Sequence, residues 1–502
     1  MINVMKIPLK DNQFQPTEWN DSSFGEYDKE MHEKILERFD NVSLRDLSSK
    51  EWNGKKYLVF PEGTVQKELN KKDNFIYKLH KRNREKPAFQ TGNVMGFFSL
   101  DKDVQMRIVS RFDKSDCNYF LHYMLQKVCN VVYVPQETDS QREDFFDFLY
   151  YLFPSYLSKA CSQGIYRAYV SREYNDANIR GPIDVARHIR FNMPSNGKVA
   201  YHTREYTTDN KITQLIRHTI EYICGLKCCG SVFESSEKSR DNKNAIVAAT
   251  PTYNKNLRRQ VISQNLYPIT HPYYTAYEPL RKICLAILCH KKKGYGNNRD
   301  NPIAGILFDG AALWEEYLAK VLENSGLPEF NELMHSNNRD RDKGVKLFAN
   351  GGVYYPDFYR RDSKNSMTIG DCDGFILDAK YKQLYTVKEE KIDSDDESEE
   401  NSSNGSNFHF QRNDLFQMLA YMHTLKANNA ILVSPYEGGR TNECYSIKFS
   451  RDSGKQRIAL GYGGEVNILA LPICADCSSF EEFSNNMKKV EKAFLDRIKE
   501  FL

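Results

Sequence analysis

Short hydrophobic runs dominate the first part of the chain after residue 50. The segments KKYLVFP, GNVMGFFSL and VQMRIVSRF, between residues 55 and 112, are rich in β-branched and aromatic residues. Such runs, separated by polar stretches, are typical of β-strands. We therefore expect a small β-rich domain in this part of the chain.

Further along, apolar positions recur with the spacing of amphipathic helices. The stretches 211–226 and 278–290 each carry such a stripe. Residues 145–166 are apolar and aromatic, but Pro154 interrupts them and charged residues flank them. An interrupted run predicts a pair of buried core helices, broken at the proline, rather than a membrane anchor.

The segment DGAALWEEYLAKVLEN, residues 309–324, predicts a helix that Asp309 caps and Gly326 stops. Its apolar stripe comprises Leu313, Trp314, Tyr317, Leu318, Val321 and Leu322. Glu315 falls at the border of this stripe, whereas Glu316 points further toward water. A carboxylate at the border can reach a metal at the edge of a sheet, although an ordinary solvated glutamate has the same spacing.

Residues 354–382, YYPDFYRRDSKNSMTIGDCDGFILDAKYK, predict two strands that carry polar groups at their ends. Asp378 and Lys380 are two positions apart, so they share one face of an extended strand, while Phe375 and Leu377 face the other side. If the two runs pair as a hairpin, Asp357 comes beside Asp378.

Two carboxylates this close repel each other, and a divalent cation removes that penalty. Mg²⁺ prefers oxygen ligands and keeps several waters, and a neighbouring lysine can position or help deprotonate a water that attacks phosphorus. The pattern therefore suggests phosphodiester hydrolysis. By itself it is a weak motif, because a surface hairpin with a charged edge reads the same way.

Residues 413–426, NDLFQMLAYMHTLK, predict a further helix. The expected core stripe comprises Leu415, Met418, Leu419, Met422 and Leu425. Gln417 and Tyr421 lie one turn apart off that stripe, where they can hold a phosphate and steady the lysine. The next segment, NAILVSP, predicts a short strand ended by Pro435.

This order of elements resembles the PD-(D/E)xK nuclease core, in the RecB-like branch with a Gln-x-x-x-Tyr helix. Within that branch the chain most resembles McrC, the nuclease subunit of McrBC-type modification-dependent restriction systems. The resemblance is carried by LWEEY at 313–317, PDF at 356–358, ILDAKYK at 376–382 and DLFQMLAYMHTLK at 414–426.

A second resemblance lies upstream. IRGPIDVARHIRFN, residues 179–192, is similar to the McrC segment built on Gly-x-Ile-(Asp/Glu), and residues 202–223 are similar to the acidic turn and long helix that follow it. The resemblance thus extends from residue 119 to residue 502. Basic residues of the first segment can contact DNA phosphates or a motor, or form a solvated helix face: Arg180, Arg187, His188 and Arg190.

The resemblance implies an α/β fold, α+β overall. A C-terminal PD-(D/E)xK restriction-endonuclease-like core, with a mixed sheet flanked by helices, follows β-rich and mixed N-terminal domains. The expected domains are a β-rich N-terminal extension at 1–115, which the strand pattern predicts, and, from the resemblance, a motor-docking domain at 116–297 and the nuclease at 298–502. Within the nuclease, residues 388–407 are acidic and without aromatic residues, which predicts a disordered insertion.

The resemblance also implies the site. Its catalytic residues are Asp357, Asp378, Lys380, Gln417 and Tyr421. Its metal ligands are Glu315, Asp357 and Asp378, for Mg²⁺ or alternatively Mn²⁺. The implied partners are double-stranded DNA and a McrB-like AAA+ GTPase hexamer, on which the N-terminal half docks. The chain has no GxxxxGK[ST] loop, so it is not the motor itself.

The net charge and the cysteine pattern further restrict the classes of protein to which the chain can belong. The net charge of +3 does not mark a nucleic-acid coat, so DNA affinity must be local. No apolar run is long enough for a transmembrane helix, and no signal peptide is evident, which predicts a cytoplasmic protein. The 12 cysteines are expected to be reduced and unligated, although Cys224, Cys228 and Cys229 cluster, as do Cys474 and Cys477.

Two alternatives remain open from the sequence. A stand-alone RecB-like exonuclease of DNA repair or CRISPR adaptation predicts an iron–sulphur cluster, which needs four cysteines flanking the nuclease core. A docking protein with a decayed nuclease site predicts lost catalytic residues, whereas the expected five are intact.

Overall fold

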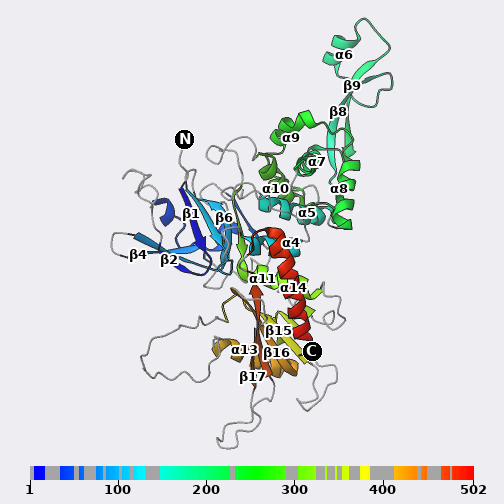
Figure 1. Cartoon of the computed structure of the whole chain (residues 1–502). Coiled ribbons are helices and arrows are strands. Elements are labelled where there is room, and N and C mark those ends of the chain that lie inside the picture. The colour runs from blue at the N-terminus through cyan, green and yellow to red at the C-terminus, as the bar shows by residue number, and fades with distance from the viewer. Residues whose placement is uncertain are drawn as a thin grey trace, which may run out of the picture. The chain divides into compact units, whose positions relative to one another are not determined.

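The computed structural model describes residues 5–16, 34–49, 56–60, 75–82, 86–100, 104–113, 118–129, 147–226, 232–234, 236–289, 303–323, 334–335, 345–346, 353–360, 374–384, 412–437, 443–448, 465–474 and 477–501 (Figure 1). These residues belong to two compact units. The first comprises Met1–Val128, Glu137–Glu143 and Ala304–Leu502, and the second comprises Cys129–Gln136 and Asp144–Ile303.

The first unit begins with the expected β-rich region. One 5-stranded sheet, here the N-terminal sheet, has the order β1-β7-β6-β10-β3. Its strands are β1 (Met5–Lys10), β7 (Val104–Val109), β6 (Val94–Ser99), β10 (Ile303–Asp309) and β3 (Lys56–Phe60). Strands β2 (Phe14–Pro16), β5 (Lys86–Thr91) and β4 (Tyr77–Arg82) form a second, 3-stranded sheet.

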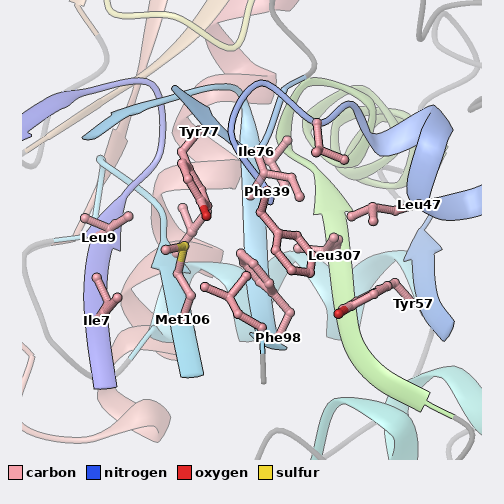
Figure 2. Packing of buried hydrophobic residues seen from close by; sticks show 14 of the residues in the cluster. Ile7, Leu9, Phe39, Leu47, Tyr57, Ile76, Tyr77, Phe98, Met106 and Leu307 are labelled. Atoms are coloured by element: carbon pink, nitrogen blue, oxygen red, sulfur yellow. The ribbon is translucent and has the colours of Figure 1, made fainter. Parts of the chain in front are cut away.

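Alternating apolar side chains of these strands build a core with helix α2 (Leu44–Ser49) (Figure 2). Tyr77 and Phe98 lie in this core, and Leu307 joins them from β10, far along the chain. Because β10 pairs antiparallel with β6, the strand that leads into the C-terminal region completes the N-terminal sheet. The structure therefore groups regions 1–115 and 298–502, which the sequence treats as separate domains, in one unit.

The other part of the first unit is a 6-stranded mixed sheet of order β11-β14-β15-β16-β18-β17. Its strands are β11 (Met334–His335), β14 (Phe358–Arg360), β15 (Gly374–Ala379), β16 (Ala427–Glu437), β18 (Glu465–Ile473) and β17 (Glu443–Lys448). Strands β15, β16 and β18 run parallel. A short pair, β12 (Val345–Lys346) and β13 (Val353–Tyr354), stands apart.

Among the described residues, this unit also contains helices α4 (Tyr119–Cys129), α11 (Gly310–Glu323), α13 (Arg412–Leu425) and α14 (Phe480–Lys499). The predicted core stripe and N-cap of helix α11 are confirmed, because its six stripe residues are buried and the Asp309 carboxylate accepts from the backbone N–H groups of Ala311 and Ala312. The mixed α/β fold is thus confirmed.

The second unit is helical, with one long hairpin. Its helices are α5 (Asp147–Cys161), α7 (Lys211–Cys224), α8 (Glu237–Ala249), η1 (Lys255–Leu257), α9 (Arg258–Gln264) and α10 (Tyr277–Cys289). Strands β8 (Ala168–Asp176) and β9 (Val199–Thr207) pair antiparallel along their whole length. Figure 1 shows this hairpin carrying α6 (Val185–Asn192) away from the helices of its unit.

Two prolines behave differently from expectation. Helix α5 runs through Pro154 instead of breaking there. Strand β16 continues past Pro435 to Glu437, whereas its pairing with β15 ends at Val433. Pro435 therefore lies beyond the last pair with β15, where a missing N–H on that side breaks no ladder bond.

Several expectations fall outside the described residues. These are the acidic segment 388–407, the domain boundary between 297 and 298, the helix stop at Gly326, and Cys228 and Cys229. Within the described ranges, no helix is both long and apolar enough to cross a bilayer.

Candidate active site

The predicted hairpin of the nuclease half forms, and its register sets the site. Phe358 of β14 lies opposite Leu377 of β15 in an antiparallel pair. Continuing that register by one residue places Asp357 across from Asp378. The Asp357 carboxylate also accepts a hydrogen bond from the backbone N–H of Ala379 at 2.7 Å, which fixes it against strand β15.

Side-chain alternation turns these groups toward helix α13. Ile376 and Tyr359 pack in the same core cluster as Met418 and Met422 of α13. Because alternate residues of a strand share a face, Asp378 and Asp357 follow Ile376 and Tyr359 to that side. The start of β15 approaches the α13–β16 junction so closely that a Cβ on Gly374 would lie 2.6 Å from the Lys426 carbonyl oxygen.

Lys380 links the carboxylates to the helix. Its ammonium lies 2.5 Å from Asp378 Oδ2 and donates to Gln417 Oε1 at 3.2 Å. Gln417 in turn donates from Nε2 to the hydroxyl of Tyr421 at 3.1 Å. The structure therefore brings together Asp357, Asp378, Lys380, Gln417 and Tyr421, although the sequence placed Tyr421 off the core stripe and here it is buried.

The electrostatics of this cluster follow from its crowding. Desolvation, together with the nearby negative charges of Asp378 and Glu315, holds the pKa of Asp357 well above its ordinary value. Burial disfavours a charged Lys380, but Asp378 and Asp357 more than offset it and raise the pKa of the ammonium. Lys380 therefore stays protonated. A permanent positive charge suits holding a phosphate better than removing a proton.

Burial also raises the pKa of Tyr421, and the carboxylates of Asp378 and Asp357 add to that rise, although the bond from Gln417 opposes it. The phenol therefore stays neutral. Since its oxygen accepts from Gln417, its own proton can be donated toward an incoming phosphate.

The donor set fits a divalent cation in its chemistry. Asp357 and Asp378 offer hard oxygen ligands, and the repulsion that raises the Asp357 pKa is what such a cation relieves. Glu315, half-buried on α11, is close enough to add to that repulsion. Among the described residues, however, no three His, Cys, Asp or Glu side chains already stand in metal-ligating geometry. Glu315 as a third ligand thus stays a prediction.

The sequence missed two sets of contacts that surround Lys380. Lys382, two residues on, forms an ion pair with the buried Asp414 of α13. Tyr381, between the two lysines, is held by Arg111 from the N-terminal sheet. The lysines themselves are visible in the sequence DAKYK, but the partners of Tyr381 and Lys382 lie far away in the sequence and leave no local pattern.

The second unit carries the other predicted segment at the end of its hairpin. We call residues 177–198, between β8 and β9, the tip. A Cβ on Gly181 would lie 2.2 Å from the His202 carbonyl oxygen, so only glycine permits this close approach. The tip exposes large hydrophobic side chains: Ile179, Ile183, Val185, Ile189, Phe191 and Met193.

The basic residues of the tip are largely engaged by partners in the tip and in strand β8. Arg180 lies 3.8 Å from the Asp176 carboxylate, and Arg187 lies 3.5 Å from Glu173. His188 Nδ1 lies 3.0 Å from the Asn192 amide, and the Arg190 guanidinium lies 5.4 Å from the Phe191 ring centroid. They brace the tip and leave its apolar side chains as its most exposed feature.

Comparison with known proteins identifies the class. A model of the family described as "McrBC 5-methylcytosine restriction system component" matches residues 89–435, which is more than half of the chain. The chain therefore belongs to that family of restriction system components. No curated protein matches it.

Two solved structures from Thermococcus gammatolerans are similar. One is a refined half-complex from a tetradecameric assembly of McrB AAA+ hexamers with bound McrC, with a TM-score of 0.44 and 14% identity over 98% of this chain and 100% of that one. The other is a McrBC complex, with a TM-score of 0.27 and 13% identity over 64% of this chain and 87% of that one.

Proposed function

We propose that this chain is the DNA-cutting subunit of a restriction system of the 5-methylcytosine type. In this proposal it is a Mg²⁺-dependent endodeoxyribonuclease that docks on, and stimulates, an AAA+ GTPase. The observation that carries the proposal is the continuous set of contacts from Asp378 through Lys380 and Gln417 to Tyr421, with Asp357 opposite. Family membership supplies the system in which this site would act.

The residues divide the chemistry among themselves. Asp357 and Asp378 would hold the cation, which supplies Lewis acidity for phosphodiester hydrolysis when bound. Lys380 is a cation held in place by Asp378 and Gln417, and it would orient the scissile phosphate. The neutral Tyr421 hydroxyl would donate to a phosphate oxygen, and both contacts would stabilise negative charge as it develops.

The tip is the surface that we assign to the partner. Large hydrophobic side chains are exposed together on α6 and the loops beside it. Such exposed apolar groups on a protruding hairpin are typical of a protein–protein contact. Resemblance to McrC makes the partner an AAA+ hexamer that hydrolyses GTP, and the second unit would then dock while the first unit cuts.

The test is cleavage by the full chain together with its AAA+ partner. Plasmid carrying 5-methylcytosine should be cut in GTP and Mg²⁺, and Mn²⁺ should substitute for Mg²⁺. EDTA or the variant Asp378→Asn should abolish the cutting. A wild-type complex that binds methylated plasmid and hydrolyses GTP without cutting it in either metal would contradict the proposal.

A further inference from the structure

Arg111 follows strand β7 and is buried beside Asp11, which follows the neighbouring parallel strand β1. Its backbone N–H donates to Asp11 Oδ1 at 2.6 Å, and its guanidinium lies 3.3 Å from Asp11 Oδ2. The two side chains are 7% and 0% exposed. A further bond of 3.4 Å runs from the guanidinium to Asn93 Oδ1.

The other arm of Arg111 reaches the nuclease half. Its Nη2 donates to the backbone carbonyl oxygen of Tyr381 at 2.6 Å, and the guanidinium lies 4.9 Å from the centroid of the Tyr381 ring. The Tyr381 hydroxyl is 2.9 Å from Ser110 Oγ, and its ring meets Phe112 at 5.3 Å. Residues Asp11, Asn93, Ser110, Arg111 and Phe112 thus form what we call the Tyr381 socket.

The held residue sits between two lysines that make site contacts. The backbone N–H of Lys380 donates to the Val433 carbonyl at 2.8 Å, and that of Lys382 donates to the Lys380 carbonyl at 2.9 Å. The chain therefore turns sharply after β15. Lys380 then reaches Asp378 and Gln417, and Lys382 reaches α13. Any shift of the peptide at Tyr381 would move both lysines.

Helix α11 begins against the same ring. The backbone N–H of Gly310 donates to the Asn93 carbonyl at 2.9 Å. A Cβ on Gly310 would lie only 2.8 Å from Tyr381 Cε1. Because α11 carries Glu315, the socket holds the start of one element that supplies the site and the end of another, β15.

We propose that Arg111 is a positioning residue of the nuclease centre, which it orders by clamping the Tyr381 carbonyl between Lys380 and Lys382. The N-terminal sheet then helps to order the nuclease centre. This inference rests on the proposed function. A buried Arg–Asp pair adds little net stability compared with packed apolar side chains, because its desolvation costs about as much as its attraction gains. The Arg111–Asp11 pair therefore contributes mainly by fixing the position of the Arg111 guanidinium.

The first test separates catalytic rate from binding. The double variant Asp11→Asn/Arg111→Gln removes both buried charges together, so no unpaired charge is left to unfold the protein. In the full chain with its AAA+ partner, kcat for cutting methylated plasmid should fall by about 10–100-fold, the cost of a misplaced reacting group, while KM stays within about twofold. Arg107→Gln, on β7 but outside the socket, should leave both unchanged.

The second test needs no activity. In the metal-free full chain, hydrogen exchange of the Lys380 amide should be at least about 10-fold faster in the double variant, because its bond to Val433 is no longer braced. Exchange in the β8–β9 hairpin of the other unit should not change. Arg111→Lys keeps the charge but loses the forked geometry, so it should fall between the wild type and the double variant.

The outcomes separate the two proposals. Wild-type kcat and wild-type Lys380 exchange in the double variant would overturn the positioning role. Equal faster exchange throughout the first unit would overturn it as well, because Arg111 would then only stabilise the fold. If the wild-type complex does not cut although Lys380 exchange responds as expected, the proposed function fails while the socket stands.

Discussion

The amide oxygen of Gln417 accepts a hydrogen bond from the Lys380 ammonium at 3.2 Å, which ties helix α13 to the end of strand β15. The amide nitrogen of the same side chain binds Tyr421 at 3.1 Å. One glutamine thus helps to orient both a cation and a hydroxyl. Its role is geometric, because it carries neither charge nor a transferable proton.

Replacing Gln417 by leucine should lower kcat for plasmid cutting by about 10-fold or more. A hydrogen bond to a charged group is worth about 1.5–3 kcal/mol, and 1.4 kcal/mol is a factor of ten. Tyr421→Phe should lose less at the lysine, since the Lys380–Gln417 bond survives. Thr424→Ala, exposed on the same helix, is the matched control. Cleavage kinetics at saturating DNA measure these effects, and a wild-type kcat in Gln417→Leu would exclude the bridging role.

The hairpin and its polar ends could be predicted from the sequence because the patterns that indicate them are local. Alternation places Asp378 and Lys380 on one face, and the antiparallel register then brings Asp357 opposite. The prediction of which residues of α13 face the core was less accurate. Aliphatic spacing favoured Leu419 for the core, whereas the helix buries Tyr421 and leaves Leu419 half-buried. The tyrosine hydroxyl is satisfied by Gln417, and a periodicity count cannot include such a partner.

Long-range pairing is what the sequence could not show. Strand β10 completes a sheet whose other strands lie about two hundred residues earlier, and Leu307 enters their core. The Arg111–Tyr381 contact spans 270 positions in the same way. Neither leaves a local pattern, so the sequence analysis divided one compact unit into two domains.

Asp357→Asn should make the metal-free protein more stable at pH 8. A raised folded-state pKa means that ionisation costs more in the folded than in the unfolded chain, so this penalty grows as pH rises above the ordinary range. Asparagine removes the charge and keeps an oxygen to accept from Ala379. A gain of about 1 kcal/mol in the free energy of unfolding would raise Tm by about 1–2 °C, because the entropy of unfolding grows with the size of the unit.

The same variant should lose its thermal response to metal. In the wild type, MgCl₂ or MnCl₂ should raise Tm in proportion to binding of the folded state. In Asp357→Asn that shift should vanish. Differential scanning fluorimetry at several metal concentrations measures both effects, and a variant that is less stable without metal, or that still responds to it, would contradict the carboxylate assignment.

Introducing negative charges into the tip should weaken the binding of the protein to its AAA+ partner. Ile189→Asp and Met193→Asp place carboxylates on exposed apolar positions, so they should not disturb the fold. Burying an unpaired charge in an interface costs several kcal/mol, so stimulation of partner GTPase should fall by at least about 10-fold. Tyr267→Asp, exposed elsewhere in the same unit, is the control. Equal losses in all three variants would show that the tip has no special role.

The two compact units should differ in their ability to fold alone. A fragment of residues 129–303 contains the second unit and should fold, bind the partner and stimulate its GTPase. Residues 298–502 alone lack the N-terminal sheet, leaving Leu307 and the Tyr381 ring without their partners. That fragment should aggregate or unfold non-cooperatively in urea. A soluble, cooperatively folded 298–502 fragment would show that the nuclease half is independent after all.

His218 should make the second unit less stable as pH falls. It is fully buried on α7, and among the described residues neither ring nitrogen has a hydrogen-bond partner. Burial, reinforced by the charges of Arg258 and Arg217, lowers its pKa to about 4 from 6.5. Between these values the unfolded chain binds the extra proton, so stability is complete above pH 6.5 and is lost toward pH 4.

From pH 7 to pH 5 the loss should be about 2 kcal/mol, since one pKa unit corresponds to about 1.4 kcal/mol. His218→Phe keeps a ring against Tyr253, which lies 4.7 Å from the imidazole centroid, and removes the titration. Urea unfolding of the 129–303 fragment at both pH values measures the difference between variant and wild type. If both lose the same free energy, the proton is taken up elsewhere in the unit and His218 is not its site.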